Sequence, residues 1–306
     1  MMSKMKKVVC FGEVLWDVLP DGKKPGGAPM NVAYHLNKLG IDSSMVSRVG
    51  NDEAGKELTE FLTKMGLSID YVQVDARYHT SEVIATMGDN HEMRYDILKP
   101  VAWDFITYTA PLEKLVTAAD VMVFGSLVAR NQETRDTLYR LLDHARFRLF
   151  DVNFRAPHYQ RETVEYLLHK ADAVKLNEHE LLIITDWMNA RAKDEHTAVS
   201  TLQEQYGLSE VIVTKGAGGA SYYTLESRHD YRAYPVTVKD TIGSGDSFLA
   251  AFLAKKLFGK SIDDMLDYAA ALGAYVTAQS GANPDYRTTD LQRFMWEKQL
   301  ERVKWK

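Results

Sequence analysis

Short runs of β-branched and aromatic residues alternate with helix-like segments along the chain, and this alternation restricts the possible folds more than any other feature. The runs that we interpret as buried strands are residues 7–11, 45–49, 121–124, 148–152, 173–176 and 211–214. Helical periodicity lies between them, for example in residues 52–65 and 132–145. Strands separated by helices are joined by crossover connections, which make the strands parallel. The sequence therefore predicts an α/β fold with a doubly wound, mostly parallel sheet.

Two stretches interrupt this alternation. Residues 71–100 lack a helical period, and Gly88-Asp89-Asn90 supplies a turn, so strands and a hairpin are predicted there. Together with residues of about 12–25, these strands are expected to form a small β-sheet lid beside the main sheet. The segments 220–223 and 231–238 are typical of antiparallel edge strands.

Composition excludes several classes of protein. A hydrophobic content of 45% and a charged content of 26% are those of a globular chain. Because the sequence contains no internal repeat and no linker, residues 1–306 are predicted to form one domain. Acidic residues (42) outnumber basic ones (37), which disfavours a nucleic-acid partner. Cys10 is the single cysteine, as expected for a cytoplasmic protein. The apolar stretch 269–278 is too short to span a membrane.

The segment Asp240-Thr241-Ile242-Gly243-Ser244-Gly245-Asp246 precedes an apolar helical run. Small residues at a helix start leave backbone N–H groups free, and the helix dipole adds positive potential, so an anion is expected there. Asp246 in the first turn could act as a general base while the amides hold a phosphoryl group. The alternative is an ordinary helix start, since acidic residues are common in first turns.

A pair of glycines, Gly26-Gly27, precedes Pro29 and Asn31 at a second predicted helix start. Glycines allow the backbone to approach a ligand closely. Asn31 and the earlier Asp17 could then bind a polyol, because an amide and a carboxylate together match adjacent hydroxyl groups. A plain loop and helix start is the alternative.

Two further motifs follow predicted strands. Asn177 and Glu180 have the spacing of a capping box, which would make them purely structural. Thr214-Lys215-Gly216 with Gly219 is similar to a nucleotide loop, but a strand-like segment follows it, so it is not a dinucleotide-binding fingerprint. The P-loop motif is absent from the sequence, and Ser244 does not lie in the G-x-S-x-G motif of a hydrolase.

In chain order, these segments resemble the ribokinase-like (PfkB) carbohydrate kinase family over nearly the whole chain. Phe11-Gly12-Glu13 with Asp17, and Gly26-Gly27 with Asn31, are most similar to fructokinases within that family. The segment Asp151-Val152-Asn153-Phe154-Arg155 is shared by fructokinases and 2-keto-3-deoxygluconate kinases, so both substrates stay open.

The resemblance implies transfer of the γ-phosphoryl group of ATP to the 6-hydroxyl of D-fructose, giving fructose 6-phosphate and ADP. In this assignment Asp246 is the base, and the amides of Gly243, Ser244 and Gly245 hold the phosphoryl oxygens. The family commonly has alanine in place of Ser244, and either residue supplies the same amide. The sugar is expected to contact Asp17, Gly26, Gly27, Asn31, Asn153 and Arg155. The nucleotide is expected to contact Asn177, Thr214, Lys215, Gly216, Gly219, Gly281 and Asn283.

The resemblance also implies ions and a partner. Glu180 is expected to hold Mg²⁺ through water, and Asp240 with Ile242 is expected to hold a monovalent cation such as K⁺. A homodimer through the lid is expected. The alternatives are 2-keto-3-deoxygluconate kinase or another sugar or nucleoside kinase of the family, a sugar sensor without catalysis, and a serine hydrolase that uses Ser244.

Overall fold

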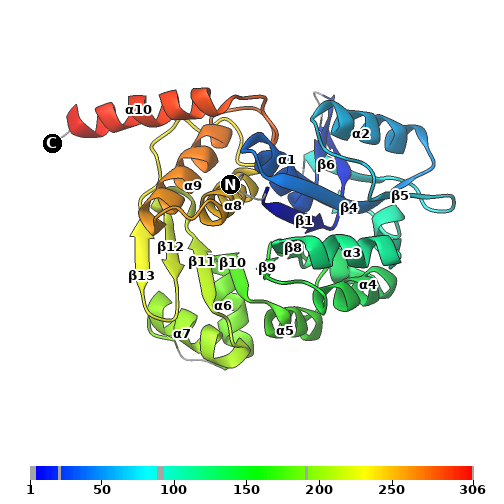
Figure 1. Ribbon diagram of the computed structural model, residues 1–306, viewed down its shortest axis with the longest axis horizontal. Helices are drawn as coiled ribbons and strands as arrows, with labels where there is room; N and C mark the ends of the chain where they lie inside the picture. The colour runs from blue at the N-terminus through cyan, green and yellow to red at the C-terminus, as the bar shows by residue number, and fades with distance from the viewer. Residues whose placement is uncertain (1–4, 20–21, 88–92, 190–191, 305–306) are drawn as a thin grey trace.

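A mixed β-sheet forms the centre of the protein in the computed structural model, which describes residues 5–19, 22–87, 93–189 and 192–304 (Figure 1). Its strand order is β13-β12-β11-β10-β9-β8-β1-β4-β5, parallel from β5 through β11 and antiparallel at β12 and β13. The strands are β1 (Lys7–Phe11), β4 (Asp42–Gly50), β5 (Val72–Asp75), β8 (Val121–Gly125), β9 (Arg148–Asp151), β10 (Ala173–Asn177), β11 (Glu210–Thr214), β12 (Ala220–Tyr223) and β13 (Arg228–Tyr231). The expected doubly wound, mostly parallel sheet is confirmed.

Helices cover both faces of this sheet, as the two layers of Figure 1 show. One layer contains α1 (Ala28–Lys38), α2 (Glu53–Lys64), α8 (Ser244–Leu257), α9 (Ile262–Thr277) and α10 (Thr288–Lys304). The other contains α3 (Ala110–Ala118), α4 (Gln132–Leu142), α5 (Arg161–Lys170), α6 (Glu178–Trp187) and α7 (Glu195–Tyr206). On β1, Val8 and Cys10 pack into the first layer while Val9 and Phe11 pack into the second. Burial on both faces explains why the strands are continuous apolar runs.

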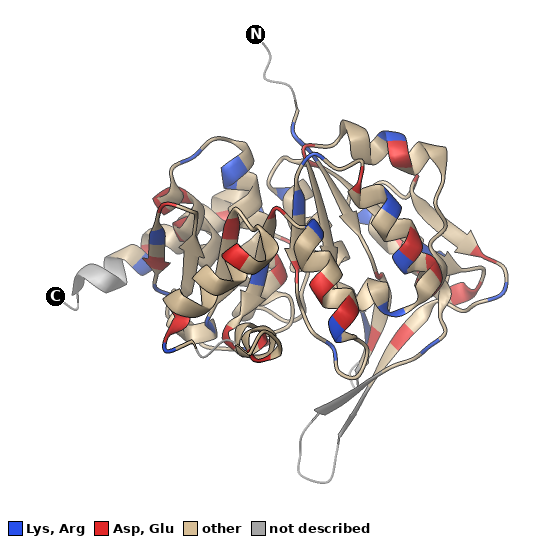
Figure 2. Cartoon of the chain, turned by 90° about the horizontal axis from the view of Figure 1, so that it is seen from below, with Lys and Arg blue, Asp and Glu red and all other residues tan. Residues whose placement is uncertain are grey.

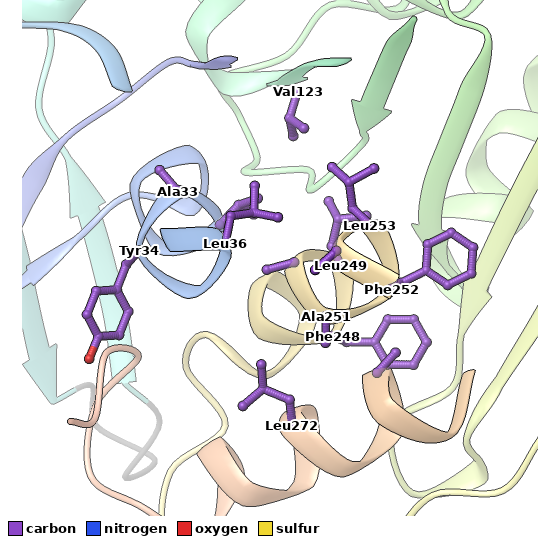
Figure 3. Close-up of a cluster of buried hydrophobic side chains, with 14 of the residues drawn as sticks. Ala33, Tyr34, Leu36, Val123, Phe248, Leu249, Ala251, Phe252, Leu253 and Leu272 are labelled. Carbon is purple, nitrogen blue, oxygen red and sulfur yellow. The ribbon is translucent and has the colours of Figure 1, made fainter. Parts of the chain in front are cut away.

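The helix α8 lies within the first layer, between α1 and α9 (Figure 3). Phe248, Leu249 and Leu253 on α8 are buried against this layer, where Leu36 of α1 and Leu272 of α9 are also fully enclosed. Each such side chain contributes roughly 1.5 to 3 kcal/mol by burial. This packing fixes the N-terminus of α8 relative to the N-terminus of α1.

A second sheet, which we call the small sheet, has the strand order β3-β2-β6-β7. Its strands are β2 (Leu15–Leu19), β3 (Gly22–Gly26), β6 (Ser81–Met87) and β7 (Met93–Ile97). β2 pairs with β3 antiparallel and with β6 parallel. Trp16 of β2 anchors the small sheet to α2, because its indole N–H donates to the Ala54 carbonyl at 2.9 Å.

Two strand predictions were wrong in detail. β5 lies in the segment expected to supply the lid, but it pairs with β4 at the edge of the main sheet, with Ser47 opposite Val72. Strand β13 ends at Tyr231, and residues 232–238 form no strand. There the chain turns toward α9, where the hydroxyls of Tyr231 and Tyr234 both donate to Asp267. The predicted turn Gly88-Asp89-Asn90 lies outside the described residues.

Charged residues of both signs are interspersed along the same helices (Figure 2). Within the described ranges, no helix has the length and apolar character needed to cross a bilayer.

Candidate functional site

A cavity of about 540 Å³ opens at the carboxyl ends of the central strands. The chain runs from β1 to β4 on one side and later returns to β8 on the other, and such reversals create a crevice in doubly wound sheets. The expected site residues that line this cavity are Asp17, Gly27, Asn31, Asn153, Arg155, Asn177, Thr214, Ile242, Gly243, Gly245 and Asp246. The structure therefore brings together side chains from both ends of the chain.

Asp246 lies in the first turn of α8 and is 9% exposed. The Asn31 amide donates to its Oδ2 at 2.8 Å, and the Asn283 amide in turn donates to Asn31 Oδ1 at 2.8 Å. Burial raises the pKa of the Asp246 carboxyl above its ordinary value, while the Lys175 ammonium and the Asn31 amide limit the rise. An oriented carboxylate with a raised pKa is suited to accept a proton.

The backbone before Asp246 is tightly constrained. Gly243 adopts φ 75°, and a Cβ there would stand 2.4 Å from the Cβ of Ala282. The following amides begin α8, where first-turn N–H groups have no helical acceptor. Ser244 turns its hydroxyl away toward α9, donating to Gly273 O at 3.4 Å and accepting from Thr277 at 3.0 Å. The Ser244 side chain is therefore held by α9 and does not line the cavity.

The Gly26-Gly27 pair supports the carboxylates on the opposite wall. A Cβ on Gly26 would stand 2.3 Å from Asp17 Oδ2, and a Cβ on Gly27 would stand 2.4 Å from the Glu13 carbonyl. Gly27 also has φ 115°, which disfavours other residues. Burial raises the pKa of Asp17 to about 6, with Arg155 opposing and Asp240 reinforcing the rise.

Two charged residues of the cavity, Lys175 and Glu13, were not expected at the site from the sequence, although Glu13 belongs to the motif that begins at Phe11. Lys175 is 7% exposed, and its ammonium donates to both Asp151 oxygens at 2.8 and 2.9 Å. Burial acts to lower the pKa of Lys175, but the carboxylates of Asp151 and Asp246 raise it overall. A lysine inside an apolar strand is a signal that could have identified it.

Glu13 follows β1 and is 4% exposed. The Ala28 N–H donates to its Oε1 at 3.3 Å. Burial raises its pKa to about 7, with Arg155 acting to lower it and Asp246 to raise it. The sequence signal that could have identified Glu13 is its position in the short segment between β1 and β2, the strand that carries Asp17.

Asn177 and Glu180 form the capping box that was weighed as the structural alternative. Asn177 Oδ1 accepts from the Glu180 N–H at 2.9 Å, and Glu180 Oε2 accepts from the Asn177 N–H at 2.8 Å. Glu180 Oε1 also accepts from the Phe154 N–H at 2.8 Å. Burial raises the pKa of Glu180. Within the described part of the chain, no three His, Cys, Asp or Glu residues gather closely enough to hold a metal ion by themselves.

The segment around Asn153 completes this wall of the cavity. Asn153 has φ 41°, a left-handed conformation that is uncommon outside glycine. Arg155 is exposed and donates to the Phe154 carbonyl at 3.1 Å. An exposed cation therefore lines the cavity, whereas Glu13 and Asp246 are buried in its wall.

The remaining expected residues lie around the cavity rather than on its wall. Asp240 joins two loops, because its Oδ1 accepts from the Ile242 N–H and its Oδ2 from the Gly281 N–H, both at 3.0 Å. The Lys215 ammonium donates to Glu195 at 3.0 Å and to the hydroxyl of a serine on β12, so other side chains already engage it. The expected nucleotide residues absent from the cavity wall are Lys215, Gly216, Gly219, Gly281 and Asn283.

Comparisons with known proteins agree with this arrangement. A family model described as "pfkB family carbohydrate kinase" matches residues 5–289. Among curated proteins, "Probable fructokinase-5" of Arabidopsis thaliana is 29% identical, over 97% of this chain and 99% of that protein.

Two solved structures show the same fold. A fructokinase from Xylella fastidiosa with bound ATP has a TM-score of 0.86 and 21% identity, covering 97% of this chain and 100% of that chain. A fructokinase from Vibrio cholerae O395 in a form with bound fructose, ADP and calcium has a TM-score of 0.82 and 25% identity, covering 95% and 99% of the two chains.

The raised pKa of Glu13 predicts a measurable effect on stability. Between pH 4.5 and about 7 the folded protein keeps a proton on Glu13 that the unfolded chain loses, so Glu13 weakens the fold as pH rises through this window. Replacing it by glutamine (Glu13→Gln) should therefore increase the free energy of unfolding by about 1 to 3 kcal/mol above pH 7, and by little near pH 4.5. Urea unfolding at each pH measures the difference from wild type.

The exposed glutamate Glu204 on α7 provides the matched control. Its replacement (Glu204→Gln) should leave the free energy of unfolding nearly unchanged at every pH, because surface substitutions have small effects. A Glu13→Gln effect that stayed constant from pH 5 to pH 8 would contradict the raised pKa.

Proposed function

This chain belongs to the pfkB family of carbohydrate kinases, and we propose that it transfers the γ-phosphoryl group of ATP to the 6-hydroxyl of D-fructose. The single observation that carries this proposal is the position of Asp246, a buried carboxylate at the start of α8 held by Asn31 in the central cavity. Fructokinase names among the relatives support fructose as the acceptor, and the Vibrio cholerae enzyme has fructose and ADP bound in its structure.

In the proposed reaction, Asp246 accepts the proton of the 6-hydroxyl as the oxygen forms its bond to the γ-phosphorus. The bond from that phosphorus to the bridging oxygen breaks, and ADP leaves. Phosphoryl transfer depends mainly on alignment and on stabilisation of the phosphoryl oxygens. The amides that begin α8 and the buried ammonium of Lys175 supply positive potential at this place.

Sugar binding is proposed for the acidic side of the cavity. Asp17 accepts hydrogen bonds from sugar hydroxyls, and Asn31 and Asn153 contribute amide groups. The close approach of Gly26 and Gly27 leaves the space that these contacts require. Arg155 contacts the sugar or the phosphate.

The second substrate is proposed to be MgATP, which enters on the side of β10 and β11. Asn177 and Thr214 line the cavity there, and Gly216, Gly219 and Gly281 contribute backbone contacts. Lys215 is paired with Glu195, so its backbone rather than its ammonium is assigned to the nucleotide.

Ions and neighbouring residues complete the proposed nucleotide site. Asn283 donates a hydrogen bond to Asn31, which in turn holds Asp246. We therefore assign Asn283 a role in orienting the Asp246 carboxylate in addition to a contact with adenine. Both oxygens of Glu180 already accept backbone N–H groups, which fits contact with Mg²⁺ through water rather than directly. The loop of Asp240 and Ile242, in which the Ile242 N–H donates to the Asp240 carboxylate, is proposed to hold K⁺. A homodimer through the small sheet is also proposed.

The proposal is tested by ADP release from the purified protein with MgATP and K⁺. The acceptors are D-fructose, glucose, mannose, ribose, 2-keto-3-deoxygluconate and adenosine. Fructose should have the highest kcat/KM, and Asp246→Asn should lower kcat by roughly 10² to 10⁴ because the proton acceptor is lost. Preferred turnover of another acceptor would contradict the assignment of fructose as the substrate but would support kinase activity. Binding of fructose without turnover of any acceptor would favour a sugar sensor without catalysis.

Removal of the Asp17 carboxylate (Asp17→Ala) should weaken fructose binding by about 1.5 to 3 kcal/mol, the range for a hydrogen bond to a charged group. Calorimetry with fructose gives this value directly, and the KM for MgATP serves as the internal control because it should change little. An unchanged fructose Kd would remove Asp17 from the sugar site.

Replacement of Ser244 by alanine (Ser244→Ala) should leave kcat within about threefold of wild type, because its hydroxyl contacts Gly273 and Thr277 rather than the cavity. Steady-state kinetics checks this expectation. A loss of a hundredfold, or labelling of Ser244 by a fluorophosphonate, would revive the serine hydrolase alternative.

A further inference from the structure

We propose that Glu13 recognises the acceptor sugar: its second carboxylate oxygen, Oε2, accepts a hydrogen bond from one sugar hydroxyl and makes the site selective for neutral polyols over sugar acids. This inference rests on the proposed function, because it concerns the acceptor half of the same cavity. It adds a residue whose role is specificity and not proton transfer.

The first argument is an unsatisfied buried atom. Glu13 lines the cavity and is 4% exposed. Its Oε1 accepts from the Ala28 N–H, whereas Oε2 is buried and has no hydrogen-bond partner in the described part of the chain. A buried carboxylate oxygen without a donor is costly. A hydroxyl group of a bound polyol supplies the missing donor.

The second argument is the rigid placement of this oxygen. Glu13 follows the end of β1, and its carbonyl lies so close to Gly27 that a Cβ there would stand 2.4 Å away. The bond from Ala28 ties the carboxylate to the N-terminus of α1. Glu13 therefore presents a fixed carboxylate to the same cavity that Asp17 and Asp246 line.

The third argument is the charge around Glu13. The charged groups that act on it are Arg155, which favours its ionised form, and Asp246, which disfavours it. Asp17 adds a further carboxylate to the same wall, and Lys175 is already paired with Asp151. A substrate carboxylate at this wall would meet like charges that Arg155 offsets in part, whereas a hydroxyl group donates to a carboxylate without such repulsion.

The decisive variant is Glu13→Gln, because it changes the chemistry of one atom. The glutamine Oε1 can keep the bond from Ala28, which places an NH₂ donor where Oε2 accepted. Ser126→Ala is the matched control. The Ser126 hydroxyl is another buried group without a hydrogen-bond partner in the described residues, it follows the neighbouring strand β8, and it does not line the cavity.

The experiment measures kcat and KM of the full-length protein with D-fructose and with 1-deoxy-, 3-deoxy- and 4-deoxy-D-fructose. In Glu13→Gln, we expect kcat/KM for fructose to fall about 10- to 100-fold, mostly through KM, with the KM for MgATP unchanged. The deoxy sugar that lacks the recognised hydroxyl should give the same kcat/KM in wild type and variant. Ser126→Ala should match wild type throughout.

Selectivity is read from the ratio of kcat/KM for fructose to that for 2-keto-3-deoxygluconate, which should fall in Glu13→Gln. The proposal is overturned if the variant loses kcat at constant KM, if it is equally impaired with every deoxy sugar, or if the ratio is unchanged. Melting curves verify that the variants are folded, and Glu13→Gln is expected to be at least as stable as wild type.

Failure of the proposed function is a separate result. If wild type prefers another neutral sugar, the assignment of fructose as the acceptor is wrong, and Glu13→Gln is compared with wild type on that sugar instead. If a sugar binds without turnover, calorimetric Kd values replace kinetics. A preference of wild type for 2-keto-3-deoxygluconate, or absence of binding to every sugar, overturns the role of Glu13.

Discussion

The hydrogen bond from Asn31 to Asp246 joins the starts of two helices that are 215 residues apart in sequence, and the geometry of the site depends on it. It lies at the cavity end of the contact between α1 and α8, whose buried side chains appear in Figure 3. Packing determines where the two N-termini lie, and the Asn31 amide determines which way the carboxylate points. The Asn283 amide extends the same bond to the last loop before α10, so that three distant segments hold a single oxygen in place.

This arrangement concentrates acids in a buried space. Burial raises the pKa values of Glu13, Asp17 and Asp246, which means that each carboxylate, once ionised, weakens the fold. Lys175 offsets part of this cost, but it is shared with Asp151. Functional sites commonly contain such groups, which lower the stability of the fold but are required for activity.

The sequence predicted the architecture well because the physical signals are local. Buried runs such as that of β1 indicate a strand covered on both faces. The helix predicted over residues 52–65 is α2, which Asp52 caps by accepting from the Gly55 N–H at 2.8 Å. The sequence predicted β5 less well, since an alternating strand does not reveal which sheet it joins. The end of β13 was missed because the contacts of Tyr231 and Tyr234 with Asp267 come from a helix far along the chain.

Residue type and neighbours alone were enough to predict that Gly243 and Asp246 lie together, and both line the cavity. Lys175 was missed although a lysine inside an apolar strand is visible in the sequence, because its pairing with Asp151 on the adjacent strand is visible only in the structure. Lys215 shows the converse, because its motif suggests a ligand contact while Glu195 on α7 engages its ammonium. Pairing across strands and helices, which one sequence does not display, separates these cases.

The two walls of the cavity are built on supports of different kinds. Asp246 stands on a helix enclosed on both sides by other helices, whereas Asp17 stands on a strand of the small sheet. The small sheet reaches the other wall through Lys24 of β3, whose ammonium donates to Ser280 at 2.9 Å beside the loop that Asp240 holds. A ligand that contacts both Asp17 and Asp246 therefore bridges the small sheet and the helix layer that contains α8. Such a ligand must match the spacing of both supports, and this requirement is a source of specificity that neither support provides alone.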